Sequence, residues 1–188
     1  MRLTAPRIEP LDPATLDDAQ KEALAPLIGT GRVLNIFRTL AHVPQALDRF
    51  LQWGGYILSK RNSLSPRDRE LAILRTGFNC KSGYEWTQHV PIGLDAGLTE
   101  SEVERIKSGP EAEGWEERDR AMLRVVDDLT RSFFVSDASW AGLTFFTDRQ
   151  KMDLVFTIGQ YTQVSMFLNS FGVQLDEGQT LDPALKGY

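Results

Sequence analysis

Hydrophobic positions recur every three or four residues along most of the chain, which is the spacing of amphipathic helices. Alternating runs of β-branched and aromatic residues between Asn-Gly or Asp-Gly turns are missing, so the pattern gives no indication of strands. It therefore predicts an all-α fold. The predicted helices span residues 13–28, 44–60, 66–78, 84–96, 100–107, 115–134, 137–146 and 148–171, with a short helical turn over 35–40.

Several helix boundaries carry capping sequences. Ser65 followed by Pro66 combines a hydroxyl acceptor with a proline at a position that needs no free N–H. Gly97 fits a helix stop, and so does Gly29-Thr30-Gly31 after the first helix. Three further sequences fit capping boxes, in which two residues each bond the other's backbone amide: Ser82 with Glu85, Thr99 with Glu102, and Thr147 with Gln150.

We expect a single domain. The 188 residues can enclose a hydrophobic core without disulfides. The polar segment 108–114, rich in Gly, Pro and Glu, is predicted to join two halves of this domain. From Gly172 onward the sequence is predicted to form a loose tail. This organisation gives an N-terminal helical arm over 1–32, a helical domain over 33–175 and a C-terminal tail over 176–188.

The acidic balance of the chain narrows its possible partners. With 21 Lys and Arg against 26 Asp and Glu, the formal net charge is −5 and the cations are scattered, which argues against a nucleic-acid binder. No apolar run approaches the roughly 20 residues that span a bilayer, and the N-terminus lacks the apolar segment of a secretory signal. We therefore expect a cytoplasmic protein that binds a small molecule and neither nucleic acid nor membrane.

Few side chains exchange protons near neutral pH, since the sequence holds one Cys and two His. This set cannot form an intrachain disulfide or a zinc finger, and no metal site is expected. Glu85 and His89 are four residues apart on one predicted helix, so the carboxylate can orient the imidazole and raise its pKa. Cys80 precedes the same helix, whose N-terminus would favour a thiolate.

Each of these residues also has an ordinary structural explanation. Glu85 can serve solely as the capping acid for Ser82. His89 can be a core histidine with a satisfied ring, and a lone Cys80 is more often a small buried hydrophobe than a nucleophile. A Glu-x-x-x-His pair is by itself a weak signal of function.

A longer block of sequence adds to this signal. The segments 65–75, 84–93 and 96–99, together with Cys80, resemble the carboxymuconolactone decarboxylase family, which shares its all-helical fold with the alkylhydroperoxidase AhpD. Flanking segments over 35–44 and 159–173 are also similar to that family. The resemblance covers most of the domain over 33–175 and implies an AhpD-like fold for it.

In the thiol-peroxidase branch of that family, the resemblance implies an acid, then a Cys-x-x-Cys pair, then a His four residues after the second Cys. Aligned on His89, the cysteine positions hold Ser82 and Glu85, and the acid position holds Glu70. Cys80 lies two residues before the first cysteine position and has no partner in the chain. A sulfenic acid on Cys80 therefore cannot be resolved as an intrachain disulfide.

The remaining acid and base residues suit proton transfer. The resemblance implies a cofactor-free lyase or isomerase that acts on a small carboxylated lactone or keto acid, where loss of carbon dioxide leaves a carbanion-like centre to protonate. An anionic substrate also needs a cation. The expected catalytic residues are Glu70, Glu85 and His89, with Cys80 as a further candidate, and the expected substrate-binding residues are Arg75, Tyr84 and Trp86.

Two alternatives stay open. Cys80 can reduce peroxide with an external thiol, which would make the protein an alkylhydroperoxidase-like or peroxiredoxin-like antioxidant. The chain can also be a non-catalytic helical oligomer, which would leave Glu70 and His89 far apart or sealed from solvent. Because relatives in the family form trimers or hexamers and the apolar helix faces are abundant, we expect a homo-oligomer.

Overall fold

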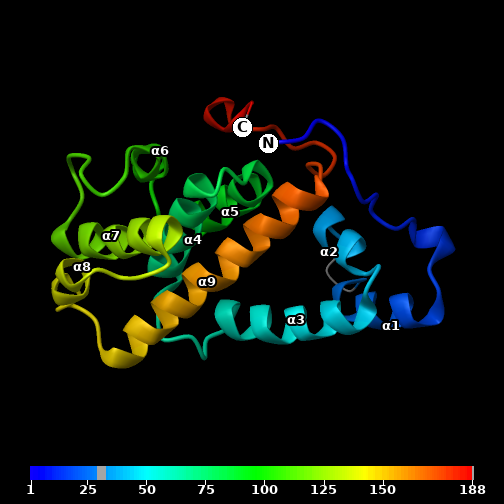
Figure 1. Ribbon diagram of the computed structural model, residues 1–188, viewed down its shortest axis with the longest axis horizontal. Helices are drawn as coiled ribbons and strands as arrows, with labels where there is room; N and C mark the ends of the chain where they lie inside the picture. Colours follow the sequence, from blue (N-terminus) through cyan, green and yellow to red (C-terminus); the bar gives the residue numbers. More distant parts are fainter. Residues whose placement is uncertain (29–32, 188) are drawn as a thin grey trace.

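The computed structural model describes residues 1–28 and 33–187, and this part of the chain is helical without a strand (Figure 1). The predicted all-α fold is therefore confirmed. The helices are α1 (Asp18–Ile28), α2 (Asn35–Leu40), α3 (Pro44–Leu58), α4 (Pro66–Asn79), α5 (Gly83–Asp95), α6 (Glu100–Ser108), α7 (Glu117–Ser132), α8 (Asp137–Gly142) and α9 (Asp148–Phe171), with the 3₁₀ helices η1 (Pro13–Thr15) and η2 (Pro183–Leu185).

Helix α4 lies at the centre of the domain. It packs against α5, α6, α7 and α9, and almost every residue from Asp68 to Gly77 is buried. In Figure 1, α9 crosses in front of α4, while α7 and α8 lie to one side and α1, α2 and α3 to the other. A helix that is surrounded by other helices buries residues on all its faces, and its polar side chains then need partners.

The buried charges of α4 have such partners. Asp68 receives two hydrogen bonds from the guanidinium of Arg118 on α7, at 2.5 and 2.7 Å. Arg75 donates to both carboxylate oxygens of Asp127, also on α7, at 2.7 and 2.8 Å. These pairs join α4 to α7 across the core, because a buried charge without its partner would be strongly destabilising.

Most of the predicted helix boundaries are confirmed. The Ser65 hydroxyl accepts from the backbone N–H of Asp68, and the glycine at 97 follows the last turn of α5 with a φ of +104°. The capping boxes of Thr99 with Glu102 and of Thr147 with Gln150 are both formed. The stop predicted at Gly29-Thr30-Gly31 lies outside the described residues.

The third predicted capping box was wrong. Ser82 makes no capping hydrogen bond, and its buried hydroxyl has no hydrogen-bond partner among the described residues. Glu85 instead extends toward His89, one turn further along α5. The pairing of Glu85 with His89 at i, i+4 replaces the predicted capping contact, and Gly77 of α4 leaves room for the Glu85 side chain: a Cβ at position 77 would lie 3.1 Å from its Cγ.

Several predicted helices are shorter than expected, among them α7, which spans Glu117–Ser132 instead of 115–134. The first predicted helix divides into η1 and α1, with Leu16 and Asp17 between them. The segment predicted as helical to residue 146 ends at Gly142, and Phe146 turns inward, where it is 5% exposed.

The C-terminal segment is packed, and the prediction of a loose tail from Gly172 was wrong. Leu185 is fully buried, and Asp182 forms an ion pair with Lys107 of α6 at 2.6 Å. The amino group of Met1 donates to the carbonyl of Leu185, so the two ends of the chain meet, as Figure 1 shows. Asp176 is buried and accepts from Tyr84 Oη at 2.6 Å.

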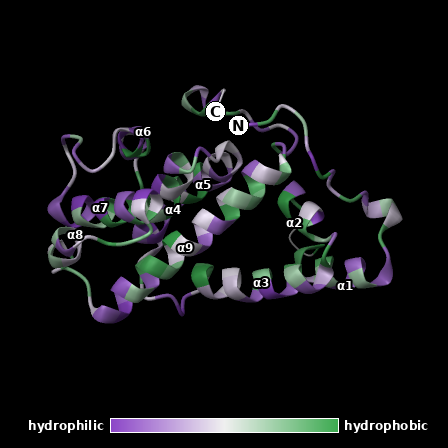
Figure 2. Cartoon of the chain, viewed as in Figure 1, coloured by the Kyte–Doolittle hydropathy of each residue, from purple (hydrophilic) through white to green (hydrophobic). Residues whose placement is uncertain are grey.

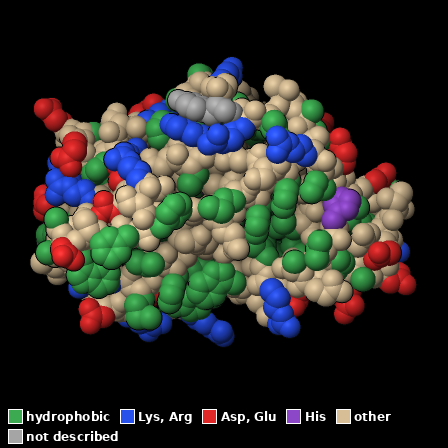
Figure 3. Space-filling model, in the orientation of Figure 1, with side chains coloured by type: hydrophobic (Ala, Val, Ile, Leu, Met, Phe, Trp, Pro, Cys, Tyr) green, Lys and Arg blue, Asp and Glu red, His purple; other side chains and the backbone are tan. Residues whose placement is uncertain are grey.

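The outer surface carries several large hydrophobic side chains. Figure 2 shows hydrophobic residues interspersed with hydrophilic ones on the visible side of α9, and Figure 3 shows hydrophobic side chains gathered on this face. Trp53 of α3, 40% exposed, stacks on Tyr56 and meets Phe156 of α9 edge-on. The homo-oligomer stays a prediction. Among the described residues, no helix combines the length and apolar character needed to cross a membrane.

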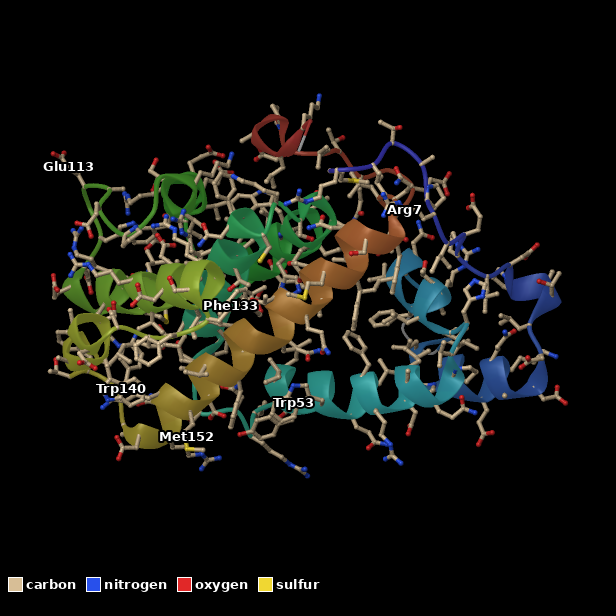
Figure 4. All side chains as sticks on the ribbon, in the orientation of Figure 1. Arg7, Trp53, Glu113, Phe133, Trp140 and Met152 are labelled. Atoms are coloured by element: carbon tan, nitrogen blue, oxygen red, sulfur yellow. The ribbon has the colours of Figure 1, made fainter. Side chains whose placement is uncertain are left out.

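We expect Asp176→Ala to lower the free energy of unfolding by about 1–3 kcal/mol, because the Tyr84 hydroxyl and the Gln88 amide would lose a buried acceptor. Urea denaturation followed by circular dichroism measures this change. Glu113→Ala is the control, since Glu113 lies on the exposed loop before α7 (Figure 4). Equal stability of the two variants would contradict a structural role for the C-terminal segment.

Candidate active site

Helices α4 and α5 position the acid and base residues that the sequence predicts. A three-residue turn over 80–82 joins the two helices, which make the most extensive helix contact in the described structure. Gly93 of α5 permits this close packing, because a Cβ there would lie 3.1 Å from Leu74 and 3.7 Å from the Cβ of Glu70. The close approach brings Glu70 of α4 opposite His89 of α5.

The imidazole of His89 lies between two carboxyl groups. Its Nδ1 is 2.7 Å from Oε2 of Glu70, and its Nε2 is 3.2 Å from Oε1 of Glu85. Because an ionised carboxylate can only accept, the bond to Glu70 places a proton on Nδ1. The second carboxyl, at Glu85, then faces the nitrogen that gains or loses a proton.

Burial shifts the pKa values of Glu85 and His89 in this cluster. The side chains of Glu70, Glu85 and His89 are exposed by 1%, 4% and 10%. Desolvation raises the pKa of Glu85 to about 7, assisted by the charge of Glu70 and opposed by His89. Burial alone would lower the pKa of His89, but the hydrogen bond to Glu70 and the two carboxylate charges raise it above its ordinary value.

Arg69, a cation on α4, lies next to Glu70. Arg69 Nε lies 3.9 Å from the second oxygen of Glu70, Oε1, and neither atom has a hydrogen-bond partner among the described residues. The positive charge of Arg69 acts against the rise of the His89 pKa. Tyr161 of α9 packs edge-on against the His89 ring, with centroids 4.9 Å apart, and burial holds its pKa well above the ordinary value.

A cavity of about 300 Å³ reaches the cluster. Its walls are mostly apolar, and its lining from the described residues includes neither Lys nor Arg. The walls come from α2, α3, α5 and α9 and from residues flanking α2: Leu34, Ile36, Phe37, Phe50, Leu51, Gly54, Gly55, Leu58, Tyr84, Glu85, Gln88, His89, Gln160, Tyr161 and Val164, together with Leu27 of α1. A small molecule in this cavity would meet Glu85 and His89 directly.

The three residues expected to bind substrate are not brought together. Tyr84 lines the cavity, although its hydroxyl donates to Asp176. Trp86 packs in the main core, with its ring 5.5 Å from that of Phe78. Arg75 binds Asp127 and the carbonyl of Ile106, away from the cavity. The structure therefore does not support Arg75 and Trp86 as cavity residues.

Cys80 belongs to a different surface hollow. It lies at the C-terminal end of α4, beside Thr162 and Ser165 of α9, and does not line the cavity of His89. Phe133, labelled in Figure 4, lines the same hollow. Burial raises the pKa of the Cys80 thiol, so the expected thiolate at the start of α5 was wrong.

Several cavity residues were not identified as site residues from the sequence. Gln88 directly precedes His89 on α5, and its helical phase beside Glu85 could have indicated a shared face. Gln160 and Tyr161 come from α9, about seventy residues later, and no local pattern connects them with His89. Among the described residues, no group of three or more His, Cys, Asp and Glu side chains is arranged to hold a metal ion.

Known proteins resemble this chain in sequence and in fold. The model of the carboxymuconolactone decarboxylase family matches residues 44–128. No curated protein matches the sequence. A peroxidase-related protein with an AhpD core from Ralstonia eutropha JMP134 superposes with a TM-score of 0.79 at 20% identity, covering 92% of this chain and 93% of that one.

Two further solved structures show the same fold. A peroxidase-related protein from Silicibacter sp. TM1040 has a TM-score of 0.76 at 18% identity, covering 93% of this chain and 95% of that one. A cysteine-to-alanine variant of the debrominase Bmp8, solved in complex with 2,3,4-tribromopyrrole, has a TM-score of 0.72 at 12% identity, covering 97% of this chain and 95% of that one. The predicted AhpD-like fold is therefore confirmed.

The raised proton affinity of the cluster predicts a pH dependence of stability. The pKa of Glu85 is about 7 in the folded chain against about 4.5 when unfolded, so the folded state binds the extra proton in this window. This stabilisation is present at low pH and is lost as the pH rises toward 7, and the raised pKa of His89 acts in the same direction above 6.5.

We therefore expect wild-type stability to fall relative to that of Glu85→Gln as the pH rises from 5 to 8, with a slope of up to about 1.4 kcal/mol per pH unit. Urea titrations of both proteins across this range measure the difference. Glu113→Gln, at an exposed loop position, should show the wild-type dependence. Parallel curves for wild type and Glu85→Gln would rule out the shifted pKa.

Proposed function

On the premise that residues 44–128 carry a carboxymuconolactone decarboxylase family segment within an AhpD-like fold, we propose that the protein is a cofactor-free acid–base enzyme. It moves a proton on a small carbonyl compound bound in the apolar cavity. The observation that carries this proposal is the imidazole of His89 held between Glu70 and Glu85 at the cavity wall. The non-catalytic alternative has less support, since Glu70 and His89 are in contact and His89 lines the cavity.

The residues have distinct roles in such a reaction. In the form of the site with neutral His89, Nε2 takes a proton from the carbon beside the carbonyl, the C–H electron pair forms the enolate, and Glu70 stabilises the imidazolium through Nδ1. The carboxyl group of Glu85, which a pKa of about 7 leaves partly protonated at neutral pH, donates a hydrogen bond from its protonated form to the enolate oxygen. The imidazolium then returns its proton to the same carbon or to a conjugated one.

The same groups serve a decarboxylation. Loss of carbon dioxide from a β-keto acid leaves its electron pair on the adjacent carbon as an enolate, and the imidazolium of His89 supplies the proton that replaces it. A carboxylated substrate finds no Lys or Arg among the described cavity residues, however. Isomerisation of a neutral carbonyl compound therefore fits the cavity better than decarboxylation of the predicted carboxylated lactone or keto acid.

One structural neighbour supports a small ring as the substrate. The debrominase of the same fold was solved with tribromopyrrole, a small ring compound. A peroxidase that relies on Cys80 has less support, because Cys80 lies outside the His89 cavity and burial raises its pKa.

We expect His89→Gln to lower the rate of proton transfer by about 10²-fold or more, since Gln cannot exchange a proton at neutral pH. Isomerisation of cyclohex-3-enone to its conjugated isomer, followed by ultraviolet absorbance, measures this rate. A β-keto acid and a carboxylated γ-lactone are assayed in parallel.

Cys80→Ser is the control and should keep the wild-type rate, because the proposed reaction does not use sulfur. Equal rates for wild type and His89→Gln would refute the role of the imidazole. A large loss in Cys80→Ser, or sulfenic acid trapped on Cys80 after peroxide treatment, would favour the peroxidase instead.

A further inference from the structure

Two adjacent glycines form the middle of one cavity wall. The residues of α3 that line the cavity are Phe50, Leu51, Gly54, Gly55 and Leu58, a stripe along one side of the helix. The stripe carries large side chains at both ends and bare backbone at its centre. The backbone at Gly54 faces Gln160 of α9, whose amide nitrogen would lie 3.9 Å from a Cβ at this position.

Neither packing nor backbone conformation requires glycine at these positions. A Cβ at Gly55 would meet nothing within 4 Å, and Gly54 and Gly55 both have ordinary helical backbone angles. Glycine inside a helix costs about 1 kcal/mol relative to alanine. The described chain gains no contact in return, so the space left by the missing side chains needs another explanation.

The geometry points to Gly54 and Gly55 as specificity-determining residues, which keep the cavity open for a neutral, flat, largely apolar ring that packs against the α3 backbone. The charge of the cavity supports the neutral form, because no described Lys or Arg lines it and His89, the one basic side chain among the described lining residues, is already bonded to Glu70. A buried anion without a cation of its own would carry a large desolvation cost. This inference names the substrate class of the proposed function and rests on the same site.

Equilibrium binding tests the inference without turnover, so its failure is distinguishable from failure of the proposed reaction. The probes are the fluorescent ring compound 2-naphthol and its anionic counterpart 2-naphthoate. We expect wild type to bind 2-naphthol at least about tenfold more tightly than 2-naphthoate. Absence of 2-naphthol binding up to its solubility limit, or preference for 2-naphthoate, would overturn the inference.

The glycines are tested by matched substitutions. Gly55→Leu should weaken 2-naphthol binding at least about tenfold, whereas Gly159→Leu should leave it unchanged. Gly159 is the control because it is also exposed inside a helix, a Cβ there would also meet nothing within 4 Å, and it does not line the cavity. Gly55→Ala should raise the melting temperature and weaken binding, and Gly159→Ala should raise the melting temperature alone.

Circular dichroism confirms folding of each variant before titration, and light scattering reports its mass. Unchanged 2-naphthol binding by folded Gly55→Leu would overturn the inference. A change in the oligomeric mass of Gly55→Leu, as measured by light scattering, would overturn the inference independently, because the glycines would then belong to a contact between copies of the chain.

Discussion

The buried hydrogen bond between Glu70 and His89 requires close packing of the helices that carry these two residues. A carboxylate that is 1% exposed needs a partner, and α5 supplies it only if its backbone packs close to α4. Gly93 allows that approach, and Gly77 leaves room for Glu85 beside it. The other buried charges of α4 are paired with α7, which leaves Glu70 to interact with His89 and, more distantly, with Arg69.

The proposed chemistry depends on which residues occupy the positions that hold thiols in the peroxidase branch of the family that this chain resembles. By resemblance, Ser82 and Glu85 stand where the peroxidase branch has its cysteine pair, while the acid and the imidazole are kept. The helix frame that would hold a redox sulfur near His89 here holds a carboxyl group, whose pKa of about 7 suits proton exchange near neutral pH. One frame can therefore serve sulfur chemistry or acid–base chemistry, according to the residue at that position.

Local rules were enough to predict the helices and the pairing of Glu85 with His89, because both depend on residues within a few positions of each other. The resemblance added Glu70, nineteen residues before His89. Sequence could not predict contacts set by packing over longer distances. Arg75 was expected to bind a substrate anion, but it forms an ion pair with Asp127 on α7. The C-terminal segment was expected to be loose, but its Asp176 accepts a buried hydrogen bond from the Tyr84 hydroxyl of α5. The cavity walls from α3 and α9 likewise exist only after folding.

The absence of Lys and Arg from the described cavity lining is compatible with efficient enolate chemistry. A permanent cation would attract an anionic ground state as strongly as the transition state, which lowers the substrate concentration needed without accelerating the reaction. In the proposed reaction His89 behaves differently, because it becomes positive by taking the proton whose loss makes the substrate negative. The attraction therefore grows as the reaction proceeds, and Glu70 stabilises the new charge from the side opposite the cavity. A neutral substrate enters such a site at low desolvation cost, and in the proposed reaction the two opposite charges develop together.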